Sequence, residues 1–179
     1  MKATGIVRRI DDLGRVVIPK EIRRTMRIRE GDPLEIFTDA GGEVVFKKYS
    51  PVGEMGTFAS QYADILYRAC GQPVIICDRD HVTAAAGVSK KEMPHERLSS
   101  SLEALIETRR THILAKDAPS VNPTDGTHHR VSVCAPIVGG GDIGGAVCLL
   151  YGENDTAPDD GDVRLTQVAA SFLGKQLES

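Results

Sequence analysis

The hydrophobic and polar positions along the chain form two patterned regions that meet at a short, turn-rich stretch. Residues 47–56, KKYSPVGEMG, combine proline, serine and two glycines, a composition typical of a linker. The pattern predicts a first domain at residues 1–50, a linker at 51–55 and a second domain at 56–179. A chain of 179 residues is long enough for two small domains.

The first domain reads as two short strands, a helix and a hairpin. Residues 4–9 and 15–19 are β-branched runs on either side of the turn signal DDLG, which predicts two strands. Pro19 suits the first turn of a helix, and the segments PLEIF and EVVFKK around TDAGG predict a β-hairpin. Because so few large side chains make a poor core, we expect a second copy of the chain to complete this domain.

The second domain mixes helices with strands. Apolar residues at heptad-like spacing predict a helix over residues 55–69 (Met55, Phe58, Tyr62, Ile65 and Ala69). Further elements are expected along the chain: two strands joined by DRDH within 72–88, a serine-capped helix over 99–110, two strands around a glycine turn within 130–151, and a closing helix over 161–178. We expect an antiparallel sheet flanked by helices, which indicates the α+β class.

Charge is distributed unevenly, although the net charge of the chain is only −3. Residues 1–29 carry nine basic and three acidic side chains, a net charge of +6, whereas residues 51–179 have a net charge of −6. A basic N-terminal segment followed by an acidic remainder of the chain indicates that the N-terminal end contacts a polyanion.

The helix predicted after Pro19 concentrates the positive charge on one face. Four basic residues follow the spacing i, i+3, i+4 and i+7, and two apolar residues that suit a core lie opposite. The basic set is Lys20, Arg23, Arg24 and Arg27, and the apolar pair is Ile22 and Met26. A solvated helix that happens to be basic is the alternative, but such faces usually mix charge signs. The absence of aromatic residues here favours a duplex over single-stranded nucleic acid.

These residues carry a resemblance to a known family. Residues 1–37, and above all the run GRVVIPKEIRR, resemble the AbrB-type swapped-hairpin DNA-binding domain of bacterial transition-state regulators, and the match extends to about Tyr49. The region that follows is similar, on weaker motifs, to a GAF domain. The combination resembles a family of sporulation regulators, which implies a DNA-binding transcription regulator of sporulation genes, with activation and repression both open.

The resemblance also implies an assembly and a set of contacts. Two protomers would complete one swapped-hairpin β-barrel, and Arg8, Arg15, Arg23 and Arg24 would face double-stranded DNA. The basic neighbours Arg9, Lys20 and Arg27 complete the predicted DNA-binding set. Two acidic residues in this region, Asp11 and Asp12, either repel phosphate or pair with and orient the neighbouring arginines.

Other motifs are weaker. The run GGGDIG satisfies the glycine spacing of a dinucleotide site, but a strand-like segment follows it, so we expect a hairpin turn. His128 and His129, with Asp125 nearby, and the cluster of Glu92, His95 and Glu96 are both expected to be solvated rather than metal-binding. We expect no metal and no cofactor, while a small-molecule ligand of the GAF-like domain stays open.

The four cysteines form no CxxC pair, and we expect Cys77, Cys134 and Cys148 to be buried apolar residues. We expect no enzyme, with a GAF-type free methionine sulfoxide reductase as a minor alternative. An antitoxin is the other alternative, although antitoxins of this type end in a flexible acidic tail and this chain continues into a patterned domain.

Assembly and location complete the expectations. Because two segments lack partners, we expect a homo-oligomer, with a dimer formed through residues 1–50 and a tetramer formed through the helices at 55–69 and 160–178. No apolar run approaches the roughly 18 residues that span a bilayer, and the N-terminus lacks the apolar core of a signal peptide. We therefore expect a cytoplasmic, nucleoid-associated protein without membrane contacts.

Overall fold

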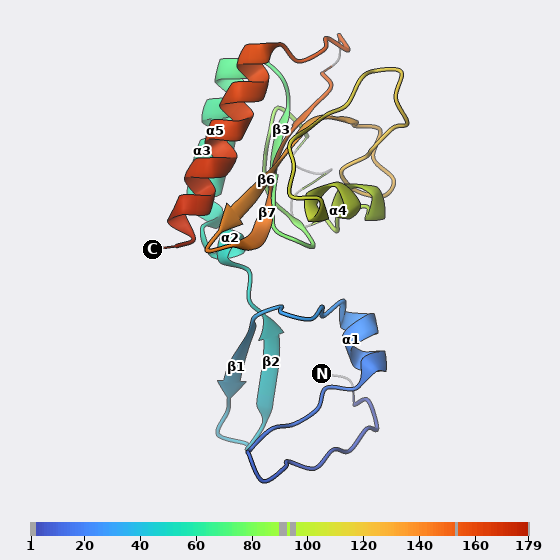
Figure 1. Cartoon of the computed structure of the whole chain (residues 1–179), viewed down its shortest axis with the longest axis vertical. Helices are drawn as coiled ribbons and strands as arrows, with labels where there is room; N and C mark the ends of the chain where they lie inside the picture. Colours follow the sequence, from blue (N-terminus) through green and yellow to red (C-terminus); the bar gives the residue numbers. More distant parts are fainter. Residues whose placement is uncertain (1–2, 90–92, 94–95, 153, 179) are drawn as a thin grey trace. The chain divides into compact units, whose positions relative to one another are not determined.

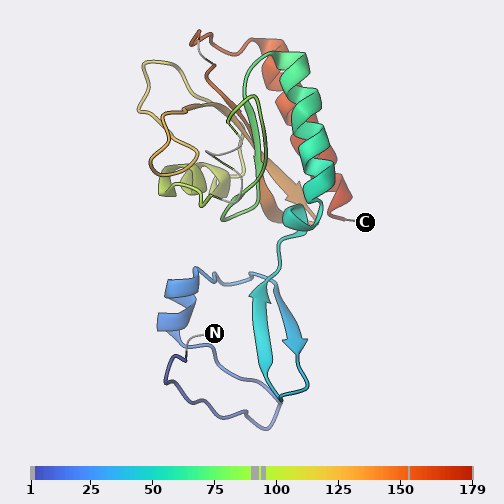
Figure 2. The same ribbon diagram turned by 180° about the vertical axis from the view of Figure 1, so that it is seen from behind.

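The computed structural model describes residues 3–89, 93, 96–152 and 154–178. The chain divides into two compact units, Met1–Tyr49 and Ser50–Ser179, and each is described by itself. Figure 1 labels the helices and strands in chain order, and Figure 2 shows them from behind.

The N-terminal unit contains one helix and one hairpin. Helix α1 (Lys20–Met26) precedes the antiparallel strands β1 (Leu34–Thr38) and β2 (Val44–Lys48). Asp39 closes the turn between the strands, because its Oδ1 accepts the backbone N–H of Glu43 at 2.8 Å. Gly42 there has a φ of 83°, which glycine adopts without the steric cost that other residues meet. The predicted hairpin is confirmed.

The two strands predicted at residues 4–9 and 15–19 are not formed within the single chain. The structure assigns no strand to either segment, and no ladder of backbone hydrogen bonds joins them within the described residues. The prediction is wrong for one protomer, because a strand needs a neighbour for its N–H and C=O groups.

The N-terminal unit also lacks a core of its own. Among residues 3–49 only Pro19 is buried, and large apolar side chains are exposed throughout the unit. The most exposed are Val7, Ile10, Leu13 and Val17, at 89, 71, 69 and 70%. Met26, predicted to face a core, is 55% exposed in the single chain.

The C-terminal unit is a three-layer α+β structure. Its elements in chain order are α2 (Pro51–Glu54), α3 (Gly56–Cys70), β3 (Val74–Cys77), β4 (Val82–Ala86), α4 (Ser100–Glu107), β5 (His112–Ile113), β6 (Val131–Gly139), β7 (Asp142–Leu150) and α5 (Asp160–Gln176). The strands form one antiparallel sheet in the order β4-β3-β7-β6-β5. Helices α3 and α5 lie side by side over one face, and α4 lies on the other (Figures 1 and 2).

Each face of this sheet has its own apolar core. The strand residues Val133, Val147 and Leu149 pack with α3 and α5, whereas Ile75 and Leu150 pack in the cluster that contains Leu102 and Ile106 of α4. The sheet therefore holds both helix layers. Among the described residues, no helix combines the length and apolar character that crossing a bilayer requires.

Helix α3 has two apolar faces. Its buried residues are Ala59, Ala63 and Leu66, which let the helix approach the sheet closely. In contrast, Phe58 and Ile65 of the predicted apolar stripe are 38 and 62% exposed. The helix was predicted correctly, but much of the stripe that predicted it faces away from the core.

Helix α4 begins at a buried serine. The side chain of Ser99 is the N-cap: its Oγ accepts the Leu102 N–H at 3.1 Å and donates to the Asn122 carbonyl at 2.6 Å. The serine cap predicted for this helix is therefore confirmed, and it also ties the helix to the loop at 122.

We expect Ser99→Ala to lower the free energy of unfolding by about 1–2 kcal/mol. The Leu102 N–H and the Asn122 carbonyl would each lose their hydrogen bond to the serine side chain. Urea denaturation of the full chain measures this change. Ser100→Ala is the matched control, since Ser100 is exposed and makes no side-chain hydrogen bond in the described structure. Equal stability of the two variants would contradict the assigned role.

Candidate nucleic-acid interface

A tight turn at residues 11–15 presents one of the predicted arginines. Asp11 Oδ1 accepts the backbone N–H groups of Leu13 and Arg15 at 3.0 and 2.8 Å, and Arg15 Nε–H donates to Asp11 Oδ2 at 2.8 Å. Gly14, with a φ of 75°, donates its N–H to the Asp11 carbonyl at 3.0 Å. Asp11 therefore pairs with an arginine, one of the two roles predicted for it.

These contacts keep the Asp11 carboxylate ionised. The backbone N–H of Arg15, followed by its side chain, lowers the pKa of Asp11 below its ordinary value. The Arg15 side chain remains 69% exposed beside it. The pair is therefore accessible to a ligand from solvent.

Five other predicted basic residues stand without acidic partners. Arg8, Arg9, Lys20, Arg23 and Arg24 are all exposed, and in the described part of the chain none of them lies within ion-pair distance of a carboxylate. Lys20, Arg23 and Arg24 belong to α1, so their predicted common face exists. Such a surface repels itself unless an anion covers it.

Arg27 departs from the predicted row. Helix α1 ends at Met26, and Arg27 has a left-handed backbone with φ 51° and ψ 41°. The prediction that Arg27 continues the helical face is therefore wrong, because the helix ends one residue too early. Its N–H instead bonds the Arg24 carbonyl at 3.2 Å and helps to close the helix.

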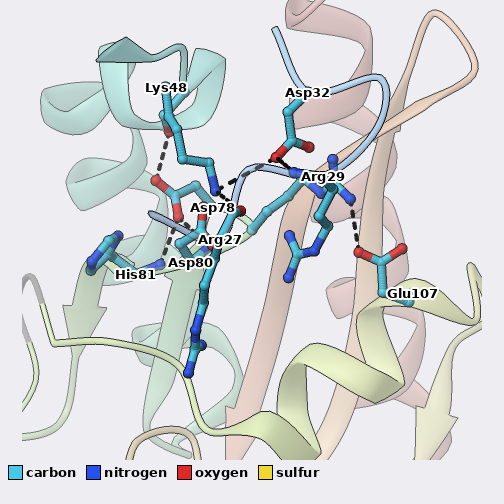
Figure 3. A network of polar contacts seen from close by, with 10 residues as sticks. Arg27, Arg29, Asp32, Lys48, Asp78, Asp80, His81 and Glu107 are labelled. Carbon is cyan, nitrogen blue, oxygen red and sulfur yellow. Dashed lines mark hydrogen bonds and ion pairs between the residues drawn. The ribbon is translucent and has the colours of Figure 1, made fainter. Parts of the chain in front are cut away.

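The end of α1 is fastened to the hairpin. Lys48 Nζ donates to the Arg27 carbonyl at 3.0 Å and lies 3.7 Å from Asp32 Oδ2, which also accepts the Arg29 N–H at 2.8 Å. Figure 3 shows Lys48 and Arg29 meeting at Asp32. Strand β2 thus fixes the direction in which the basic face of α1 points.

The C-terminal unit begins with a second polar anchor. Ser50 caps α2 by accepting the Gly53 N–H at 3.0 Å, and its hydroxyl donates to Asp78 Oδ2 at 2.7 Å. Asp78 Oδ1 accepts the N–H groups of Asp80 and His81, each at 2.7 Å, as Figure 3 shows from close by. The residue that follows the N-terminal unit is therefore held by the β3–β4 turn.

The predicted histidine loop lines a cavity. Residues 124–129 and Glu96 surround a space of about 300 Å³ in the C-terminal unit, with His128, His129 and Asp125 on its wall. Among the described residues, no group of three potential ligands has metal-binding geometry. Glu92 and His95, the rest of the other weak cluster, lie outside the described residues. Within the run GGGDIG, Gly140 and Gly141 form the predicted turn between β6 and β7.

Three cysteines meet inside the sheet. Cys77, Cys134 and Cys148 are fully buried, as predicted, and Cys134 lies directly opposite Cys148 on the neighbouring strand. Hydrogen bonds with Cys134 and Cys77, together with burial, raise the pKa of the Cys148 thiol. Sequence spacing did not reveal this cluster, because the strand register alone brings the residues together.

Comparisons with known proteins place these observations in a family. Residues 54–178 match the family described as stage V sporulation protein T C-terminal, transcription factor, and residues 7–53 match the family described as antidote-toxin recognition MazE, bacterial antitoxin. Stage V sporulation protein T of Bacillus subtilis (strain 168) is 51% identical over 99% of both chains. The transition state regulatory protein AbrB of the same organism is 59% identical over 28% of this chain and 52% of its own length.

A solved structure supports the fold of the second unit. The type II free methionine-R-sulfoxide reductase from Thermoplasma acidophilum matches with a TM-score of 0.52 and 9% identity, over 70% of this chain and 94% of that one. At this identity the likeness concerns the fold alone. The expected α+β class is confirmed, with one antiparallel sheet between two helix layers in the second unit.

An AbrB-like N-terminal region joined to the C-terminal domain of a sporulation transcription factor defines a class of two-domain transcription regulators. The similarity over the whole length of the chain identifies one family within this class. This chain belongs to the stage V sporulation protein T family of transcription factors. That similarity favours the regulator over the antitoxin alternative, whose family matches only the N-terminal region.

Proposed function

We propose that this regulator of sporulation genes binds duplex DNA through a dimer of its N-terminal units. The observation that carries the proposal is the set of exposed basic side chains without carboxylate partners on and around α1. Phosphate groups would remove their mutual repulsion and release counterions. The proposed contacts are Arg8, Arg9, Arg15, Lys20, Arg23 and Arg24, with Arg27 at the edge of the surface.

The dimer follows from the missing core. A second copy would cover the exposed apolar side chains of the N-terminal unit and give residues 4–9 and 15–19 the strand partners that they lack. Burial of apolar surface contributes about 25 cal/mol per Å², so several such side chains support a stable association. The dimer would also present each basic residue twice to DNA.

The C-terminal unit is proposed to join two such dimers into a tetramer. Helices α3 and α5 share an outward apolar surface made of Phe58, Ile65, Leu165, Val168 and Phe172. The rings of Phe58 and Phe172 lie 5.9 Å apart and those of Tyr62 and Phe172 lie 5.7 Å apart, so the surface is ordered by aromatic contacts. An exposed apolar surface of this kind suits the same surface of a second copy.

The remaining proposals follow from this function. The protein would act on DNA in the cytoplasm, associated with the nucleoid, as a binding protein rather than an enzyme. The acidic C-terminal unit would hold the DNA-binding N-terminal units together. Residues 1–50 alone would recognise the DNA sequence. The cavity at residues 124–129 is the proposed place for any small-molecule ligand.

The double substitution Arg23→Ala/Arg24→Ala tests DNA binding. Each phosphate contact contributes about 0.9 to the slope of log K against log salt, so a dimer that loses both pairs should lose up to about 4 from this slope. Affinity for duplex DNA, measured by fluorescence anisotropy at several salt concentrations, gives the result. The melting temperature should stay the same, because both side chains are exposed and alanine favours helix.

Glu21→Ala is the control on the same helix and should not weaken binding. Unchanged affinity of a folded Arg23→Ala/Arg24→Ala variant would contradict the proposed function.

The substitution Val168→Asp tests the tetramer. Val168 is 60% exposed, so a charge there should leave the fold intact but oppose burial between copies. Sedimentation equilibrium should show a tetramer for the wild-type chain and a dimer for the variant. Ile113→Asp is the matched control, since Ile113 is 61% exposed on β5, and should stay tetrameric. A wild-type dimer, or a variant that remains tetrameric, would refute the assembly.

A further inference from the structure

Asp11 is an acidic residue in the basic segment 1–29. Among the described residues, the hydrogen bonds of its side chain all lie within residues 11–15: two from backbone N–H groups to Oδ1 and one from the Arg15 side chain to Oδ2. The arrangement is therefore local, and each protomer carries it whatever the assembly. Asp12, its neighbour, is exposed and makes no such side-chain contact in the described structure.

The Asp11–Arg15 ion pair is too exposed to contribute much to stability. Instead, the pair limits the directions in which the Arg15 guanidinium can point. The bond engages Nε of Arg15, and the terminal Nη groups make no hydrogen bond within the described residues. The carboxylate thus restricts the guanidinium from one side and leaves its outer donors available.

Phosphate is a poor ligand for such a pair. A carboxylate 2.8 Å from Nε cancels the charge on which a phosphate contact depends, and it repels phosphate itself. The edge of a guanine carries neutral acceptors, O6 and N7, so a contact there depends on direction more than on net charge. Arg8, Arg9, Arg23 and Arg24, which have no acidic partner, keep the full charge that phosphate requires.

We propose that Asp11 is a positioning residue that holds the Arg15 guanidinium for bidentate recognition of a guanine edge in the major groove. This inference rests on the proposed function, namely that the N-terminal unit binds duplex DNA. It divides the arginines into two roles. Arg15 reads sequence, whereas the unpaired arginines bind the backbone and set affinity.

Asp11→Asn removes the ion pair and keeps the hydrogen bonds of the turn. The amide oxygen of asparagine still accepts the backbone N–H groups of Leu13 and Arg15, but the ionic bond to Nε is lost. Arg15→Lys is the second variant: it leaves the turn and the positive charge in place and removes the planar fork. Asp12→Asn is the control, because it removes the same charge one residue away.

The assay uses the full-length protein and two duplexes. One is selected by the wild-type protein from a randomised pool, and the other has the same composition in scrambled order. We expect Asp11→Asn and Arg15→Lys each to lower the ratio of the two affinities roughly tenfold. The salt slope should hardly change, and the melting temperature of the protein should stay the same. Asp12→Asn should keep the wild-type ratio.

Three results would overturn the inference, and they differ from one another. If Asp11→Asn tightened binding to both duplexes equally and left the ratio unchanged, Asp11 would only repel phosphate. If the wild-type protein enriched no duplex from the pool, the proposed function would fail and the role of Asp11 with it. A loss of discrimination in Arg15→Lys but not in Asp11→Asn would show that Arg15 reads DNA without help from Asp11.

Discussion

The central constraint on this molecule is that its first 49 residues cannot bury their own apolar side chains. Only Pro19 is buried among residues 3–49, while Val7, Ile10 and Val17 are at least 70% exposed. The free energy of folding depends mainly on such burial, so a unit without it requires a partner. The proposed second copy would satisfy this need and would also double the basic surface, which links the stability of the unit to its proposed function.

The C-terminal unit meets the same requirement in a different way. Its sheet carries an apolar core on each face, and the two helix layers complete both within one chain. What remains exposed is the outer surface of α3 and α5, with Ile65 and Val168 at about 60%. The unit therefore has apolar cores of its own, and the outward surface of α3 and α5 is exposed in the single chain.

Much of the fold could be predicted from the sequence where the signals are local. Turn residues such as Asp39 and Gly42 predicted the hairpin β1–β2, and the serine cap predicted the start of α4. The strands at 4–9 and 15–19 were not found within the single chain, and the proposed pairing with a second copy would use atoms that one chain does not contain. The buried stripe of α3 was missed because alanines give a weak hydrophobic signal.

At the candidate site, too, the sequence predicted local features correctly but missed those that depend on the three-dimensional structure. Periodicity placed Lys20, Arg23 and Arg24 together, but it extended the row to Arg27, where the helix has already ended. From residue type alone, Asp11 could either repel phosphate or pair with an arginine. The geometry of the turn shows that it pairs with Arg15. The thiol cluster depends on the register of three strands, which composition does not contain.

Hydrogen–deuterium exchange of the full-length protein tests most directly whether a second copy completes the N-terminal unit. In the described part of one chain, the backbone N–H groups of residues 4–9 and 16–18 have no strand partner, so strand pairing between copies should slow their exchange. We predict that these segments exchange as slowly as β1 and β2 in the assembled protein, and that dilution below the dissociation constant removes the protection. Exchange at the rate of an unstructured peptide, at concentrations where the protein is oligomeric, would contradict the account.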